Sequence, residues 1–407
     1  MRVLIVTQHF WPESFRINEI AESLVQHGVV VDVLTGKPNY PEGKIYSGYK
    51  AAGCMCEQWR GISVFRVPLF PRGVRSALRL FLNYLSFILS GLVVGAWQLR
   101  KIKSDVILVY ATSPLLQAFP ALFIGWIKRV PVVVYVQDLW PESLKATGYV
   151  CNPLVIRMVE LLVKLIYRRS ALILVSSRPF RGYIERFVPS SEIVYYPNSV
   201  DVSFCDPDSG LRPEVPALDE GFCVVFAGNV GAAQAVHVIS EAAARLRDVG
   251  DIRLVVLGAG SELEWMRAQI VELGLTNLFL AGRFPVEAMP NLLSRADVLL
   301  VTLANQEIFS ATVPNKVQAY MAVGRPIIAA INGEGARLVH EAEAGISLPA
   351  EDGPALADAI MKLYSMPSTD RDRLGENGRR YYRKHFDHEH LVDELISHLK
   401  SVMKAKE

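Results

Sequence analysis

The stretch VLLVTLANQEIFSATVPNKVQAYMAVGRPIIAA, residues 298–330, predicts a strand, a polar loop, a helix and a second strand in direct succession. Pro314 suits the first helical turn, because a missing N–H leaves no donor unpaired there. The N–H groups of Asn315, Lys316 and Val317 would then point outward from the positive end of the helix, where a phosphate can bind. The pattern fits an ordinary helix start in a parallel sheet equally well.

The alternation of short β-branched runs with longer helical patterns extends over the whole chain. The expected strands are 3–7, 29–35, 64–69, 106–111, 132–137, 172–176 and 193–196, and then 222–229, 253–257, 278–281, 298–302 and 326–330. We therefore predict an α/β protein with two Rossmann-like domains, each a doubly wound parallel sheet. Because open sheets bind ligands beyond the carboxyl ends of their strands, the two domains are expected to face a central cleft.

The domain boundaries follow from length and composition. A chain of 407 residues is long for one hydrophobic core. The segment 201–220 is rich in Pro, Asp and Gly, which favours a linker between a domain over 1–200 and a domain over 221–385. Residues 386–407 are expected to form a C-terminal helix.

Charge and cysteine content limit the partners and the compartment. The 43 Lys and Arg residues nearly balance 41 Asp and Glu, so a general nucleic-acid binder is not expected. The first apolar run, 1–7, is too short for a signal peptide, and the cysteines show no paired spacing. We predict a protein of the cytoplasm without a zinc site.

One segment, 72–103, predicts association with a membrane. Residues 80–99 carry no charge, and the surrounding interval 60–103 has many Lys and Arg residues but no acid. Its length allows a bilayer span, although polar residues dilute it, and a buried core helix is a further alternative. We favour insertion into one leaflet, with the arginines at anionic lipid on the inner face of the plasma membrane.

The loop after the expected strand 222–229 carries groups that suit a phosphate. Gly228 and Gly231 permit a ligand to approach the backbone closely. Asn229 and Gln234 can donate hydrogen bonds to it. The loop therefore predicts part of an anion site.

Two further strand ends add weaker candidates. Gly258 belongs to a Gly-Ala-Gly sequence that lacks the third glycine of a dinucleotide-binding loop, so nicotinamide is not expected. Arg283 ends the next strand, where its guanidinium suits a diphosphate or simply covers a helix.

The sequence gives only weak evidence for a metal site. Asp206-Pro-Asp208 and Asp370-Arg-Asp372 spell the DxD of metal-dependent transferases, but the first lies in the expected linker and the second in a polar helical region. The histidines of HFDHEH, 385–390, precede a terminal helix. No metal and no cofactor are expected.

The strand-end motifs occur in an order that resembles a known family. AGNVG, LGAG, AGRF and VPNKVQAYMAVGRPIIA, with PNSVD at 197–201, resemble the group 1, or family 4, glycosyltransferases of GT-B fold. TQHFWPES and VQDLWPES, beginning at 7 and 136, resemble more closely the L-fucosamine (FucNAc) transferases of bacterial O-antigen and capsule assembly. The resemblance implies transfer of a sugar from a UDP-sugar to a lipid-diphosphate-linked acceptor at the cytoplasmic membrane face.

Departures from the family pattern bear on mechanism. The two glutamates that many relatives carry are matched here by Ala311 and Ala319. A histidine common in the amino-terminal domain is matched by Thr112 or Gln137. More of the positive charge that stabilises the leaving diphosphate must therefore come from Lys316, Arg283 and the helix start.

The first domain supplies further candidates. Asp138 and Glu142 become the polar candidates for catalysis, with Asp138 orienting or deprotonating the acceptor hydroxyl. Arg16 is a candidate for reaching the phosphate across the cleft.

Two alternative functions stay open at this point. A nucleotide-sugar 2-epimerase of GT-B fold would use the same cleft without a lipid acceptor. A non-catalytic membrane assembly subunit would keep the fold, and the absence of the two family glutamates at Ala311 and Ala319 favours it.

Overall fold

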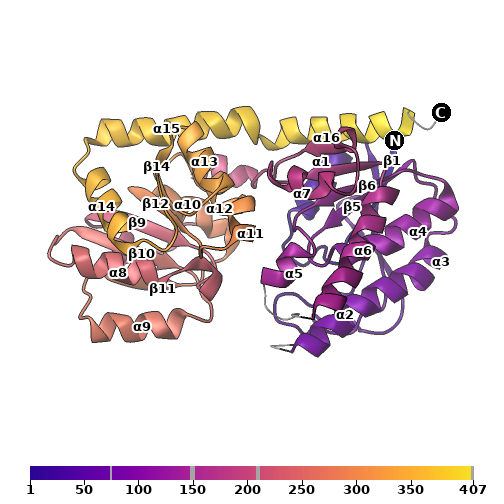
Figure 1. The fold of residues 1–407 in the computed structure, drawn as a ribbon, viewed down its shortest axis with the longest axis horizontal. Helices are drawn as coiled ribbons and strands as arrows, with labels where there is room; N and C mark the ends of the chain where they lie inside the picture. Colours follow the sequence, from indigo (N-terminus) through magenta and orange to yellow (C-terminus); the bar gives the residue numbers. More distant parts are fainter. Residues whose placement is uncertain (74–75, 147–151, 208–210, 405–407) are drawn as a thin grey trace. The chain divides into compact units, whose positions relative to one another are not determined.

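The computed structural model describes residues 1–73, 76–146, 152–207 and 211–404. They form two compact units, each built around one sheet (Figure 1). Unit 1 comprises Met1–Pro197 and Glu389–Glu407, and unit 2 comprises Asn198–His388. The prediction of two parallel-sheet α/β domains is confirmed. Arg75 and Asp208 of the basic and DxD segments lie outside the described residues.

Unit 1 contains an eight-stranded sheet in the order β3-β4-β2-β1-β5-β6-β7-β8. Its strands are β1 (Arg2–Val6), β2 (Val30–Thr35), β3 (Met55–Trp59), β4 (Ile62–Arg66), β5 (Val106–Ala111), β6 (Val132–Val136), β7 (Leu172–Val175) and β8 (Ile193–Tyr195). All neighbours are parallel except β3 and β4. The sequence did not predict β3, because none of the five residues of this edge strand is fully buried and its pattern is weak.

Helices cover both faces of this sheet. They are α1 (Ile17–Gln26), α2 (Ala77–Ser90), η1 (Gly91–Gly95), α3 (Ala96–Gln98), η2 (Leu115–Gln117), α4 (Ala118–Lys128), α5 (Glu142–Ala146), α6 (Pro153–Arg169), α7 (Phe180–Glu185), η3 (Ser190–Glu192) and α16 (His388–Lys404). The three elements of the apolar segment, α2, η1 and α3, form one helix over Ala77–Gln98. By length and composition alone, this helix is able to cross a membrane.

The C-terminal helix belongs to the core of unit 1. Leu391, Leu395 and Leu399 of α16 are buried in one apolar cluster with β-strand residues of that unit. The hydroxyl of Tyr196 also donates to the carbonyl oxygen of Leu391 at 2.8 Å. The chain thus returns to its first domain after completing the second.

Unit 2 contains a six-stranded parallel sheet in the order β11-β10-β9-β12-β13-β14. Its strands are β9 (Phe222–Ala227), β10 (Ile252–Leu257), β11 (Leu278–Gly282), β12 (Val298–Thr302), β13 (Ile327–Ala330) and β14 (Gly345–Leu348). Its helices are η4 (Val202–Cys205), η6 (Pro216–Leu218), η7 (Ala232–Gln234), α8 (His237–Leu246), α9 (Leu263–Glu272), η8 (Val286–Ala288), α10 (Met289–Ser294), α11 (Glu307–Ala311), α12 (Asn315–Val323), α13 (Glu334–Glu341), α14 (Gly353–Tyr364) and α15 (Ser368–His385). The sequence did not predict β14, which has four residues and only one fully buried.

The described part of the expected linker, 201–220, packs onto unit 2. Phe204, Val215 and Leu218 are buried in the same apolar cluster as strand residues of that sheet. Proline and glycine content favoured a linker there, and the apolar side chains between them fold against the second domain.

The strand order defines one switch point in each sheet. Successive strands proceed in opposite directions from β1 and β5 in unit 1, and from β9 and β12 in unit 2. The helices that follow such a pair cover opposite faces, which leaves a crevice beyond the carboxyl ends of the two strands. The loops after these four strands are therefore the places to look for a ligand.

Candidate active site

In unit 2, Lys316 lies across the loop that follows β9. An ideal Cβ placed on Gly228 would lie 2.7 Å from Cε of Lys316, and Gly228 has a φ of +133°. The backbone conformation favours glycine at 228, and the missing Cβ leaves room for the Lys316 side chain. The two residues come from the segments that follow the two strands at the switch point, β9 and β12. The structure thus brings these two predicted residues together.

The ammonium group of Lys316 is buried in an apolar setting. Its Nζ lies 3.8 Å from the ring centroid of Phe226, and it has no hydrogen-bond partner among the described residues. Burial lowers the pKa of Lys316 to about 7. A buried cation without an anion is costly, and strongly perturbed groups of this kind gather at functional sites. The position suits an anionic ligand.

Helix α12 begins one residue later than predicted. Pro314 is the N-cap residue, and its carbonyl oxygen accepts from the Val317 N–H at 2.9 Å. The prediction that the Val317 N–H points outward unpaired is therefore wrong, because that donor makes the first bond of the helix. The outward donors expected at this helix start are those of Asn315 and Lys316.

The PNSVD motif is linked to the same helix. Asn198 donates from Nδ2 to Oδ1 of Asn315 at 3.4 Å, and its carbonyl oxygen accepts from Nε2 of Gln318 at 2.7 Å. These contacts hold the chain entering unit 2 against the first turn of α12. The motif therefore positions the N-terminal end of the helix, where an anion was predicted to bind.

Glycine residues let the backbone segments beside Lys316 pack closely against one another. An ideal Cβ on Gly258 would lie 1.8 Å from the carbonyl oxygen of Gly228, and one on Gly231 would lie 2.8 Å from Nδ2 of Asn229. Asn229 donates from Nδ2 to Oε1 of Gln234 at 3.1 Å. The two amides predicted as phosphate donors are thus paired with each other, and Asn229 is exposed.

Arg283 stands apart from this group. It follows β11, the edge strand, two positions from β9 in the sheet, and it is exposed. At about 4.8 Å per strand, the two strand ends are roughly 10 Å apart. Among the described residues, Arg283 has no contact with Lys316 or Gly228.

The two alanines that match the family glutamates are buried. Ala311 and Ala319 both have little exposed surface, and Ala319 belongs to the apolar core of unit 2. The hydroxyl of Tyr320, next to Ala319, accepts from the N–H of Ala227 at 3.1 Å. Neither alanine side chain offers a polar group to a ligand.

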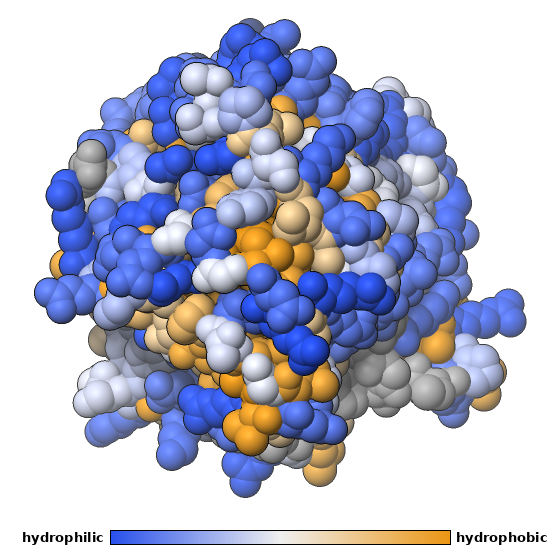
Figure 2. Space-filling model, turned by 90° about the vertical axis from the view of Figure 1, so that its left-hand side faces the viewer, coloured by the Kyte–Doolittle hydropathy of each residue, from blue (hydrophilic) through white to orange (hydrophobic). Residues whose placement is uncertain are grey.

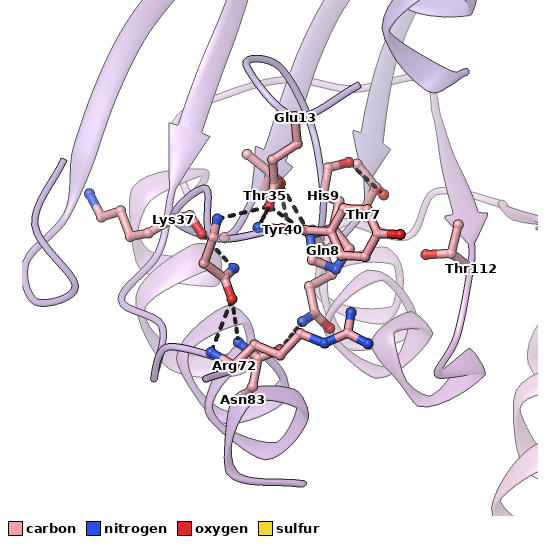
Figure 3. Close-up of polar contacts among 12 residues, drawn as sticks. Thr7, Gln8, His9, Glu13, Thr35, Lys37, Tyr40, Arg72, Asn83 and Thr112 are labelled. Atoms are coloured by element: carbon pink, nitrogen blue, oxygen red, sulfur yellow. Dashed lines mark hydrogen bonds and ion pairs between the residues drawn. The ribbon is translucent and has the colours of Figure 1, made fainter. Parts of the chain in front are cut away.

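In unit 1, the switch point carries a histidine that was not predicted from the sequence. Nδ1 of His9 lies 3.0 Å from Oε1 of Glu13 (Figure 3). The same carboxylate oxygen accepts from the N–H groups of Asn39 and Tyr40 at 2.8 and 2.7 Å. A carboxylate held in this way fixes the orientation of the imidazole. The signal in the sequence was a histidine followed four residues later by glutamate, directly after the first strand.

A buried amide network links this edge of the sheet to α2. Gln8 donates from Nε2 to Oδ1 of Asn83 at 2.6 Å (Figure 3). Asn83 donates in turn to the carbonyl oxygen of Phe70 at 2.7 Å and to Oδ1 of Asn39 at 3.3 Å. Asn83 is fully buried although it lies in the apolar helix. The network anchors one side of α2 at the carboxyl ends of β1 and β2.

Asp138 lies at the same edge, after β6. Its Oδ2 accepts from the N–H of Ser113 at 3.0 Å, in the loop after β5. Burial raises the pKa of Asp138, and the hydrogen bonds from Ser113 oppose this rise. A carboxylate with a raised pKa is better suited to accept a proton from a hydroxyl group.

The other two predicted residues of unit 1 have charged partners. Glu142, at the start of α5, forms an ion pair with Arg186. Arg16 forms an ion pair with Glu19, three residues further along the chain. The pair occupies the charge of Arg16 within unit 1, whereas Oε2 of Glu142 stays buried without a hydrogen-bond partner among the described residues. Asp138 is the stronger catalytic candidate because it has a raised pKa and no cationic partner among those residues.

The histidine motif and the second aspartate motif lie on α15 and at the start of α16, not in the loops that follow the switch-point strands. Asp370 and Asp372 are in the charged helix α15, and Nδ1 of His388 lies 2.8 Å from Oγ of Ser199. Among the described residues, no group of three His, Cys, Asp or Glu side chains is placed to hold a metal ion.

Comparison with known proteins agrees with this arrangement. Residues 14–199 match the family model described as glycosyl transferase 4-like domain, and residues 221–366 match the one described as glycosyl transferases group 1. These two matches cover most of both units. The chain is therefore a glycosyltransferase enzyme, and its domains support membership of the family 4 glycosyltransferases of GT-B fold.

Individual relatives point to the same class of enzyme. WcaI of Escherichia coli K12, named as a colanic acid biosynthesis glycosyl transferase, is 25% identical over 80% of this chain and 82% of its own. The O-antigen chain mannosyltransferase C of Escherichia coli is 24% identical over 45% and 47%. The structure of Anabaena HepE in complex with UDP superposes with a TM-score of 0.70 at 14% identity, over 98% of this chain and all of that one.

Proposed function

We propose that this glycosyltransferase moves N-acetyl-L-fucosamine from a UDP-sugar to a polyprenyl-diphosphate-linked saccharide during the synthesis of a surface polysaccharide such as O-antigen. The observation that carries the donor half is the buried ammonium of Lys316, beside Gly228 and the start of α12. A departing UDP bears about two negative charges, and a preorganised cation with helix N–H groups stabilises them. The solved complex of HepE contains UDP, which supports UDP as the nucleotide.

The acceptor half rests on unit 1. Asp138 is half-buried beside the loop after β5, and its raised pKa fits a group that orients or deprotonates the acceptor hydroxyl. The names of the two Escherichia coli relatives, one in colanic acid and one in O-antigen synthesis, support a saccharide acceptor. Fucosamine as the sugar rests on the segments that begin at 7 and 136 in the sequence.

We place the enzyme on the cytoplasmic face of the plasma membrane as a peripheral protein. One side of the helix Ala77–Gln98 is packed along its length against unit 1, through Asn83, Phe87, Gly91 and Gly95. A helix fixed in this way cannot cross a bilayer without drawing its domain into the hydrocarbon. Insertion of the opposite, exposed side into one leaflet requires no such movement.

The test is a transfer assay with a polyprenyl-diphosphate-N-acetylglucosamine acceptor and a panel of UDP-sugars that includes UDP-N-acetylfucosamine. We expect a lipid product heavier by one N-acetylfucosamine residue, measured by mass spectrometry. A product with another sugar would replace the proposed donor. UDP binding without any product would contradict transfer to this acceptor, and epimerisation of UDP-N-acetylhexosamine alone would favour the epimerase.

A further inference from the structure

The exposed apolar side chains of unit 1 gather on three neighbouring helices. Helix α4 packs against both α2 and α6, so the three lie side by side on one face of the sheet (Figure 1). The apolar face consists of Leu78, Phe81, Leu85, Leu89, Val93 and Trp97 on α2 to α3, Phe123, Trp126 and Ile127 on α4, and Leu154, Val155, Met158, Leu161, Leu162 and Leu165 on α6. Each of these side chains is more than a third exposed.

The spacing on each helix shows that this face is continuous along the helix axis. The exposed positions of the first helix recur every three or four residues from Leu78 to Trp97, opposite the buried positions of the same helix. Those of α6 follow the same pattern from Leu154 to Leu165. Soluble proteins rarely expose contiguous apolar patches of more than a few hundred Å², so three such helices require a partner.

The first helix and α4 are held together by specific contacts, and α6 packs beside α4. Lys128, at the end of α4, donates from Nζ to the carbonyl oxygens of Leu99 and Ile102 at 2.8 and 2.6 Å. Gly91 lies close to Pro120 of α4, since an ideal Cβ there would be 2.7 Å from its Cγ. Movement of one helix away from the others would break these contacts.

The charges around the apolar face are almost all positive. Arg157, Lys164 and Arg168 recur beside the apolar stripe of α6, and Arg79 and Arg100 lie near the two ends of the first helix. Over Ala77–Gln98, Ala118–Lys128 and Pro153–Arg169, the sequence contains one acidic residue, Glu160. A basic rim of this kind complements anionic phospholipid, at about 1 kcal/mol for each cation near the surface.

Two of the predicted membrane cations do not contribute to this rim. Arg66 is fully buried and forms an ion pair with Glu57, and Arg60 forms an ion pair with Glu22. The expected role of Arg66 at lipid is therefore wrong, whereas the Arg60 side chain is 60% exposed and its role at lipid stays a prediction. The rim is supplied by Arg79 and Arg100 of the predicted segment and by α6, which lies outside that segment.

Aromatic side chains at the edges add a second reason to choose a bilayer. Trp97 and Trp126 are 60% and 72% exposed, and Arg100 lies over the ring of Trp97 at 4.2 Å. Exposed tryptophan beside arginine is typical of the membrane–water interface. In contrast, hydrophilic residues predominate on the face drawn in Figure 2, and apolar residues gather there mainly in its central and lower part.

We propose that α2, α4 and α6 together form one docking surface for an anionic phospholipid bilayer, with the apolar face in the outer part of the leaflet. This inference deepens the proposed peripheral location, and it rests on that part of the proposed function only. The helix from Ala77 to Gln98 would lie in the plane of the membrane over roughly 33 Å.

The test is flotation of the purified full-length protein with vesicles of phosphatidylcholine containing about a third phosphatidylglycerol. The wild type should float with these vesicles, and less with phosphatidylcholine alone or in high salt. The α4 variant Trp126→Gln/Ile127→Gln and the α6 variant Leu154→Gln/Met158→Gln should each bind at least about tenfold more weakly. The control is Val271→Gln, an equally exposed apolar position in unit 2, which should float like the wild type.

The outcomes separate this inference from the enzymatic proposal. Unchanged flotation of the α6 variant would overturn the three-helix surface, and no flotation of the wild type would overturn membrane docking altogether. In either case, transfer to a detergent-solubilised acceptor would still show the proposed reaction. If the variants instead dissociated a lipid-independent dimer, as measured by sedimentation, the face would be an interface between copies and the inference would fail.

Discussion

Among single residues, Lys316 shows a conflict between stability and ligand binding. Its Nζ is buried against Phe226 without a hydrogen-bond partner among the described residues. The folded state therefore disfavours protonation of Lys316. Its pKa is about 7 in the folded protein, whereas an unfolded lysine has a pKa near 10.4. Functional sites commonly retain such destabilising groups, since a ligand charge makes them favourable.

Replacing Lys316 with Met should separate the two effects. We expect UDP affinity to fall about tenfold to a hundredfold, because a charge-assisted contact is lost. The melting temperature of the ligand-free variant should rise at pH 6.5, where wild-type Lys316 carries its buried charge. Scanning calorimetry and UDP titration measure both quantities. A variant with unchanged UDP affinity would remove Lys316 from the donor site.

The protonation of Lys316 should also be visible in the pH dependence of binding. With a pKa of about 7, most of the free enzyme holds a neutral Lys316 at pH 8.5. Binding of UDP should then draw a proton from the buffer, and affinity should decrease as pH rises above 7.5. The terminal phosphate is already ionised there, with a second pKa of about 6. Calorimetry in two buffers of different ionisation enthalpy measures the proton, and Lys316→Met should abolish its uptake.

Among the secondary-structure elements, the helix from Ala77 to Gln98 is fitted closely to its domain. Gly91 and Gly95 lie on its buried side, where ideal Cβ atoms would be 2.7 Å from Cγ of Pro120 and 2.9 Å from Cδ2 of Leu34. Small residues at these positions let the helix approach both α4 and β2. The same helix presents large apolar side chains on its other side.

A larger residue on the buried side should therefore loosen the helix. We expect Gly91→Leu to destabilise unit 1 by about 1–3 kcal/mol, because the contact with Pro120 leaves no room for a side chain. Urea unfolding measures this change. The matched control is Val93→Leu, two residues away and exposed, which should leave stability within about 0.5 kcal/mol of the wild type. Equal effects of the two substitutions would refute the packing argument.

At the scale of the whole molecule, unit 1 consists of two segments that are far apart in the sequence, Met1–Pro197 and Glu389–Glu407. Leu391, Leu395 and Leu399 of α16 complete the core around β1 and its neighbours. The first domain is therefore unfinished until the second has been synthesised. Stability of unit 1 thus depends on a segment, Glu389–Glu407, that the whole of unit 2 separates from Met1–Pro197.

Shortening one of these leucines tests this dependence. Leu395 is fully buried, so Leu395→Ala should destabilise unit 1 by about 2–5 kcal/mol. UDP binding, which we assign to unit 2, should persist at temperatures where unit 1 has begun to unfold. Circular dichroism measures the unfolding of unit 1, and UDP titration at the same temperatures measures whether unit 2 still binds its ligand. Loss of UDP binding in step with unit 1 would show that the two units unfold together.

Several parts of the fold and site followed from local patterns alone. The two alternating series predicted nearly all the buried strands, because parallel strands covered on both faces need continuous β-branched runs. Lys316 and Gly228 were both selected as strand-end or helix-start residues. The edge strand β3 and His9 were missed, since a half-exposed strand and a single histidine have no distinctive pattern in one sequence.

Local sequence was enough for the class of fold, the glycine-lined loops and the apolar character of Ala77–Gln98, because each depends on residues close together in the chain. Only the tertiary structure shows that the ammonium group of Lys316 is buried beside Gly228 and that Arg66 forms an ion pair with Glu57. It also shows that α6 extends the apolar face of α2. Those facts depend on which strands become neighbours. Strand order is set by contacts between distant segments, and no local pattern contains it.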